Sequence, residues 1–239
     1  MYLLDVNPYF DEIQEQRAYA IQLHNLANYV DHRIDNLVRL SLLERSLQIS
    51  KQINFLSGIV KASRSLMIAH SSSKSNAKFL LYSSIDRQYW EVFNLARKSE
   101  YYVVLVKYFG GNNLLKKNEK TVKSFIDDLE PLINRDTRYD LIWMFETIRQ
   151  FYFWSLKEFQ SVYESCLIIE KIIIPKSFEI EVKQANSLNL AVCLIYLEKP
   201  ELAYKKIKYF ENKIALGTSN WYSHSLTYVG ILIYNREIQ

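Results

Sequence analysis

LKEFQSVY at residues 156–163 and LEKPELAY at residues 197–204 match each other 41 residues apart (156 to 197). In each stretch a helical run of apolar residues ends at a leucine, two charged residues follow, and a second helical run begins. Such a unit is two antiparallel helices joined by a tight turn, and it cannot bury its apolar face alone. The match therefore predicts stacked helix–turn–helix units in the C-terminal part of the chain.

The composition extends this prediction to the whole chain. Only five Gly and four Pro occur in 239 residues, although 49% of the residues are hydrophobic. Folds built from many strands need many turns, and turns use Gly and Pro. The sequence therefore predicts an all-α protein, and the Tyr, Phe and Trp content argues against a disordered chain.

Long helices are expected in the N-terminal part, residues 1–76. No Gly or Pro lies between residues 9 and 57, and apolar residues recur at three- and four-residue steps, with breaks expected near Asn25 and Asn36. A second apolar series has the spacing of a short coiled-coil seam: Ile49, Ile53, Leu56, Val60 and Met67. The loop SSSKSN at 71–76 then separates this part from a helical-repeat region at 77–239.

The repeat region is expected to contain these helices: about 77–97, 99–109, 119–134 with a kink near Pro131, 138–156, 159–174, 178–197, 200–213, and one that begins near Trp221 and is capped by Ser219. The segment YYVVLVKYF at 101–109 also has the composition of a strand, which is the alternative there.

The stretch NLAVCLIYLEKPELAYKKIKYF (189–210) resembles the tetratricopeptide repeat. Leu190, Ala191 and Leu194 match the apolar and small residues of the family's first helix, and Ala203 matches the small residue of its second helix. The sequence departs from the family pattern at Glu198, where a Gly is usual, and its 41-residue step exceeds the family's roughly 34. The resemblance implies an α-solenoid of antiparallel pairs.

The resemblance also implies a concave groove that holds a protein or peptide. By that analogy the groove residues are Met144, Thr147, Phe151 and Trp154 in one unit, and Asn189, Val192 and Tyr196 in the next. Asn189 resembles a position that holds a peptide backbone or a C-terminal carboxylate in some members, but the accompanying lysines are not evident. The alternative is that these aromatic residues belong to the core.

A positively charged face is a second candidate site. No Asp or Glu occurs between Arg45 and Ile85, a stretch with these basic residues: Lys51, Lys61, Arg64, Lys74 and Lys78. Such a face could contact nucleic-acid phosphates or an acidic partner. The alternative is a solvated helix face whose charges are balanced in space. A sensor module of a larger regulator is a further alternative function.

Enzymatic chemistry is not expected from the sequence. The loop FGGNNLLKKNEKT at 109–121 lacks phosphate-loop spacing. A zinc site needs three or four ligands that converge, and His24, His32, Asp31 and Asp35 are expected to be surface or interhelical polar residues instead. His70 and His224 lie beside serines without a triad's pattern, and a loop and a helix surface are expected there. We expect no cofactor and no metal, and Cys166 and Cys193 to be buried thiols. No apolar run spans a membrane, and MYLLDVNPYF is unlike a signal peptide, so a cytoplasmic protein is expected.

The last segment, WYSHSLTYVGILIYNREIQ, resembles the first helix of a further unit. Its apolar residues would need a cover, so we expect either a longer natural chain or a homo-oligomer that pairs through this helix.

Overall fold

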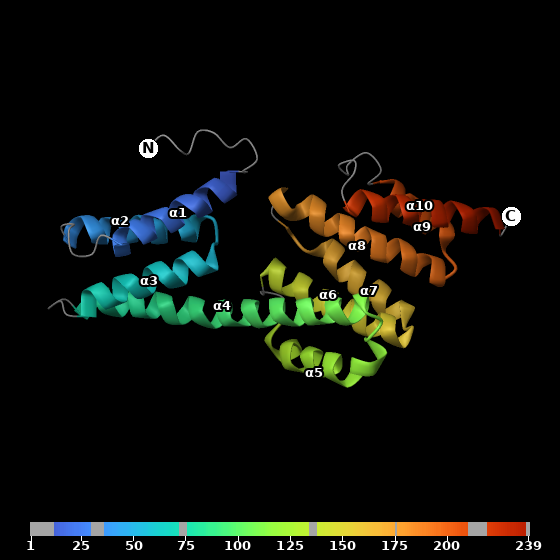
Figure 1. Cartoon of the computed structure of the whole chain (residues 1–239), viewed down its shortest axis with the longest axis horizontal. Helices are drawn as coiled ribbons and strands as arrows, with labels where there is room; N and C mark the ends of the chain where they lie inside the picture. Colours follow the sequence, from blue (N-terminus) through green and yellow to red (C-terminus); the bar gives the residue numbers. More distant parts are fainter. Residues whose placement is uncertain are drawn as a thin grey trace. The chain divides into compact units, whose positions relative to one another are not determined.

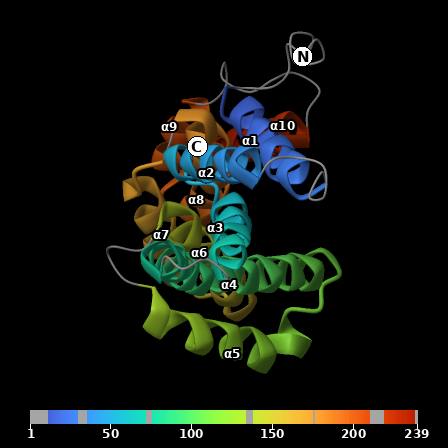
Figure 2. The same cartoon turned by 90° about the vertical axis from the view of Figure 1, so that its left-hand side faces the viewer.

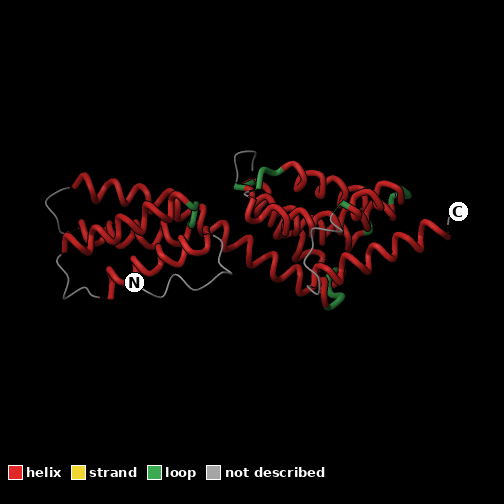
Figure 3. Tube along the Cα trace, turned by 90° about the horizontal axis from the view of Figure 1, so that it is seen from above, coloured by secondary structure: helices red, strands yellow, loops and turns green. Residues whose placement is uncertain are grey.

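The computed structural model describes residues 12–29, 36–71, 76–133, 138–174, 176–209 and 219–237. These residues are helical with short turns, and none of them forms a strand (Figures 1 and 3). The α-helices are α1 (Glu12–Tyr29), α2 (Asn36–Gln52), α3 (Leu56–Ser71), α4 (Asn76–Gly111), α5 (Glu119–Leu129), α6 (Tyr139–Leu156), α7 (Phe159–Lys171), α8 (Lys176–Tyr196), α9 (Pro200–Lys208) and α10 (Ser219–Glu237). Short 3₁₀ helices, η1 (Lys116–Asn118) and η2 (Glu130–Leu132), flank α5. The predicted all-α class is confirmed.

Contacts divide the chain into two compact units, Met1–Arg97 and Lys98–Gln239, so the division falls inside α4. The boundary predicted at residue 76 coincides with the start of that helix. Each unit has its own core and is described separately below.

In the first unit, α1 packs on α2 and α2 packs on α3 (Figure 1). The main core cluster comes from Leu43 and Leu47 of α2, Ile59 and Leu66 of α3, and Tyr82 of α4. The buried Ser46 hydroxyl donates a 2.8 Å hydrogen bond to the carbonyl of Ala20, which ties α2 to α1. Apolar burial thus holds the helices together, and this polar contact sets their register.

The expected coiled-coil seam is interrupted, because α2 ends at Gln52 and α3 begins at Leu56. Asn54 between them has φ = 56°, a left-handed conformation that Asn tolerates better than most residues. The break expected near Asn25 was wrong, since Asn25 lies inside α1, whereas Asn36 does begin a new helix.

Helix α4 is one continuous helix of 36 residues, so the predicted break near residue 98 was wrong. No Gly or Pro lies between residues 76 and 109 to interrupt it. The segment 101–109 is helical, and the strand alternative fails: Val103 and Val106 are buried at a three-residue step, while Val104 is exposed.

The second unit packs its helices in order along the chain: α5 on α6, α6 on α7, α7 on α8, α8 on α9, and α9 on α10. Helix α5 also lies beside the second part of α4 (Figures 1 and 2), where the Tyr102 and Phe125 rings stack with their centroids 4.0 Å apart. The interruption expected near Pro131 is present, because α5 ends at Leu129 and a 3₁₀ turn follows. The expected end of the helix predicted at 200–213 lies outside the described part.

Four described helices end in the same backbone turn. Asn54, Asn113, Lys157 and Glu198 all have positive φ between 56° and 60°. After α6 the Glu158 amide donates to the carbonyl of Phe153 at 3.0 Å, and after α8 the Lys199 amide donates to that of Leu194 at 2.8 Å. These bonds satisfy carbonyls that a helix end otherwise leaves unpaired. Lys157 and Glu198 occupy equivalent positions in the two matched sequence stretches.

No helix in the described ranges has the length and apolar character to cross a lipid bilayer.

Candidate functional site

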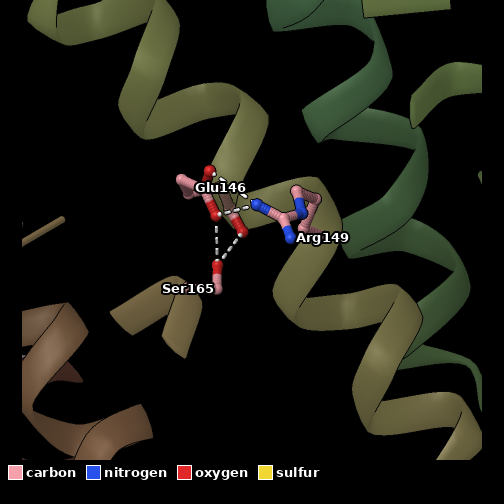
Figure 4. A network of polar contacts seen from close by, with 3 residues as sticks. All are labelled: Glu146, Arg149 and Ser165. Atoms are coloured by element: carbon pink, nitrogen blue, oxygen red, sulfur yellow. Dashed lines mark hydrogen bonds and ion pairs between the residues drawn. The ribbon is translucent and has the colours of Figure 1, made fainter. Parts of the chain in front are cut away.

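The buried Glu146 carboxylate of α6 forms an ion pair within that helix and a hydrogen bond to α7 (Figure 4). The Glu146 side chain accepts hydrogen bonds from the Arg149 guanidinium, at 3.0 and 3.2 Å, and from the Ser165 hydroxyl at 2.6 Å. The same hydroxyl lies 3.1 Å from the Glu146 carbonyl. Burial raises the pKa of Glu146, while the contacts with Ser165 and Arg149 act in the opposite direction. Because Ser165 is fully buried, no substrate can reach its hydroxyl, and the contact is structural.

A second network of amides joins α6 to α7 and α8. Gln150 donates to the Asn186 amide oxygen at 3.2 Å and to the Cys166 sulfur at 3.4 Å. Asn186 donates to the Cys166 carbonyl at 3.0 Å, and Asn189 donates to the Gln150 amide oxygen at 2.8 Å. Side-chain amides aligned in this way are costly to bury unless each is paired. The network therefore fixes the relative positions of three helices.

The amide network forms one side of a cavity of about 390 Å³. Helices α6 and α8 supply most of the lining, with Lys107 from α4 and Thr227 from α10. The aromatic rings of Trp143 and Phe151 provide apolar surface, and Gln150 and Asn189 provide polar groups. An apolar recess with a few polar groups is the usual form of a ligand site.

Four of the predicted groove residues line this one cavity: Thr147, Phe151, Asn189 and Val192. The others lie elsewhere. Met144 is buried within the unit. Trp154 and Tyr196 belong to an aromatic cluster with Phe159 at the ends of α6 and α8, where the Phe159 and Tyr196 rings stack 4.2 Å apart.

The other lining residues had not been predicted, and Trp143 and Lys107 are two of them. Trp143 lies one helical turn before Thr147, and the four-residue spacing of 143, 147 and 151 could have identified it. Lys107 comes from a helix outside the two matched sequence stretches, so no local signal places it here. Gly110 brings that helix close to α6, because a Cβ atom at this position would lie 2.6 Å from the Phe151 ring.

The predicted basic face carries acidic partners. Arg64 pairs with Asp86 at 3.2 Å and stacks over the Trp90 ring at 4.4 Å, and Lys78 pairs with Glu44 at 3.4 Å. Lys51 lies 6.0 Å from the Tyr89 ring centre, Lys61 is exposed, and Lys74 lies outside the described residues. Glu44 and Asp86 lie just outside the two ends of the stretch that lacks acidic residues. In the folded protein their carboxylates lie beside basic side chains of that stretch.

The histidines and cysteines are packing residues. His224 is buried and lies 2.8 Å from the Ile207 carbonyl, and His70 is buried against the Tyr82 ring, so neither occupies the loop or helix surface expected for it. His24 contacts Ser65 at 3.1 Å, while Asp31, His32 and Asp35 lie outside the described residues. Both thiols are free and buried, as predicted, and hydrogen bonding to Cys193 together with burial raises the pKa of Cys166. Within the described ranges no three His, Cys, Asp or Glu side chains gather as metal ligands.

Comparisons with protein-family models, with curated proteins and with solved structures found no match to this chain.

Proposed function

We propose that the second unit is a non-enzymatic scaffold of stacked helix pairs that binds an extended peptide or a protein segment. The cavity lined by α6 and α8 is the observation that carries this proposal, because it combines the Phe151 ring, the Asn189 amide and the Val192 side chain in one recess. Aromatic side chains in a desolvated recess supply most of the energy at protein interfaces.

The solenoid part of the proposal is supported by the helix pairs α6–α7 and α8–α9. Their turns, at Lys157 and Glu198, share positive φ and equivalent hydrogen bonds, 41 residues apart (157 to 198). Two helix pairs with the same turn and the same order of packing suit a repeat whose first helices, α6 and α8, line a common surface.

Peptide recognition also suits the polar groups of the cavity. Asn189 donates its amide hydrogen to Gln150, and its own oxygen has no hydrogen-bond donor among the described residues. The Lys107 side chain is exposed and has no ion-pair partner in the described ranges. A peptide backbone offers N–H groups to the Asn189 oxygen, and an acidic peptide side chain suits Lys107.

The test is selection of binders from a phage-displayed library of linear peptides, followed by fluorescence anisotropy with the selected peptides. Val192→Trp fills the cavity and should abolish binding, whereas Val229→Trp, at an exposed valine of α10, should leave it unchanged. Phe151→Ala should weaken binding about 30-fold if the ring is an anchor, since a hot-spot residue contributes about 2 kcal/mol. Failure to select any peptide, or equal binding by Val192→Trp, would contradict the proposal.

A further inference from the structure

A second recess, of about 600 Å³, lies between α7, α8 and α9. We call it the α7–α9 pocket. It shares no lining residue with the cavity described above, and α8 contributes different faces to the two: Leu190 and Leu194 to the pocket, Asn189 and Val192 to the cavity. Its volume falls in the range of about 300–1,000 Å³ that is usual for small-molecule sites.

The interior of the α7–α9 pocket is apolar. Leu190 and Leu194 are fully or almost fully buried and provide its inner surface, with Leu167 of α7 and Leu202 of α9 at its sides. Leu202 is 48% exposed, so its side chain is only partly covered by the protein. A ligand with an apolar chain or ring would remove more of this surface from water.

The charged groups of the pocket lining are mainly positive. The lining contains three lysines and one acidic residue: Lys183, Lys205, Lys206 and Glu170. Lys206 donates to both carboxylate oxygens of Glu170 at 2.7 Å, so this acid is already neutralised. Lys205 has no ion-pair partner among the described residues. An anionic group is therefore the charge that the lining favours.

One buried polar group also faces this pocket. Ser187 lines it and is only 3% exposed, yet its hydroxyl makes no hydrogen bond to another described residue. The Ser187 oxygen is not one of the fully enclosed polar atoms that lack a hydrogen bond, so it is open to the pocket, where a ligand oxygen would be its hydrogen-bond partner. This group is independent of the lysines and points to the same class of ligand.

We propose that the α7–α9 pocket binds a small amphipathic anion, an apolar chain or ring that carries one carboxylate or phosphate group. The apolar part lies on Leu190 and Leu194, and the anionic group lies near Lys205. This site is separate from the peptide cavity and does not depend on the function proposed for it.

The experiment is isothermal titration calorimetry of the full chain with four unbranched ligands of eight carbon atoms each, every one below its micellar concentration. Octanoate and octyl phosphate should bind saturably, and the tighter of the two identifies the head group that the site takes. Octanol and octylammonium should bind more weakly or not at all. Equal binding by all four would mean adsorption to apolar surface and would overturn the proposal, as would the absence of saturable binding.

Matched variants locate the site. Lys205→Ala should weaken binding of the anion about fivefold, as expected for a partly exposed charge pair, while Lys208→Ala on the same helix should not. Leu202→Trp should block the pocket, and Leu226→Trp, at an exposed leucine of α10, should leave binding intact. Circular dichroism verifies that each variant is folded. Unchanged binding by both Lys205→Ala and Leu202→Trp would refute this location.

Discussion

Glu198→Gly should stabilise the protein, although the substitution introduces the residue that disfavours helices. Glu198 follows the end of α8 with φ = 57°, and the turn is held by the bond from the Lys199 amide to the Leu194 carbonyl at 2.8 Å. The Glu198 side chain is exposed and has no partner among the described residues, so its removal breaks no contact there.

The magnitude follows from two opposing effects. A residue with a Cβ atom in the left-handed helical conformation costs about 1–2 kcal/mol, a cost that glycine avoids. Glycine also increases the conformational entropy of the unfolded chain, which lowers the free energy of unfolding by roughly 0.4–1 kcal/mol and offsets part of this stabilisation. The expected net gain is about 0.5–1 kcal/mol, which corresponds to an increase in Tm of about 1–4 °C for a chain of this size.

Urea unfolding followed by circular dichroism measures the change in the free energy of unfolding. Native-state hydrogen exchange of the α8 and α9 amides then assigns it to the second unit. Glu198→Ala is the control that keeps the Cβ atom, and it should remain within about 0.5 kcal/mol of the parent. Lys205→Gly places glycine inside α9 and should cost about 1 kcal/mol.

Equal stabilities of Glu198→Gly and Glu198→Ala would refute the reasoning, because only the first relieves the left-handed conformation. A loss of stability in Glu198→Gly comparable to that in Lys205→Gly would show that the position behaves as ordinary helix. Lys157→Gly, at the equivalent turn with φ = 60°, provides an independent repetition and should give a gain of the same size.

Three further predictions concern the cores of the two units, and urea unfolding checks each. Gly58→Ala should lower the free energy of unfolding by about 1–3 kcal/mol, because its Cβ would collide with the Ser50 hydroxyl. Gly230→Ala, with open space around it, should raise the free energy of unfolding by about 1 kcal/mol. A more stable Gly58→Ala than Gly230→Ala would contradict the packing. Ser165→Ala should lower the free energy of unfolding by about 1–3 kcal/mol, because Glu146 would lose a buried hydrogen bond. An unchanged unfolding midpoint would contradict this prediction. Glu146→Gln should become more stable relative to the parent as the pH rises from below 4.5 to neutral. Burial raises the folded-state pKa of the Glu146 carboxyl above 4.5, so the parent loses folding free energy over that interval when the carboxyl ionises, and the neutral amide does not. A stability difference that does not vary with pH would refute the raised pKa.

The helices of the second unit were predictable because each is bounded by a local signal. Pro200 begins α9, and the charged pair at 157–158 ends α6, as expected. The length of α4 was not predicted, although no residue near 98 breaks a helix, because the Tyr and Val content of 101–109 obscured the helical spacing. Helix propensity and burial, not β propensity, decide that segment.

The candidate sites were predictable only in part, for a related reason. Thr147 and Phe151 lie on one face of a single helix, so their shared position follows from a four-residue spacing. Lys107 reaches the same cavity from α4, and the pairing of Lys78 with Glu44 joins α4 to α2, with all of α3 between them in the sequence. Contacts of this kind depend on how helices pack, which no local periodicity specifies.

The amide network explains why the cavity has a defined position. Apolar side chains on α6 and α8 could pack in registers one helical turn apart, about 5.4 Å, with similar burial. Such a shift would break the bond from Asn189 to Gln150 and the bond from Gln150 to Asn186, and it would leave buried amides without partners. A polar group in an apolar interface can specify register in this manner, as a single buried Asn does in coiled coils. Gln150, Asn186 and Asn189 therefore set the spacing of the two helices and also present polar groups to any ligand between them, so a substitution such as Gln150→Leu should change ligand selectivity and helix register together.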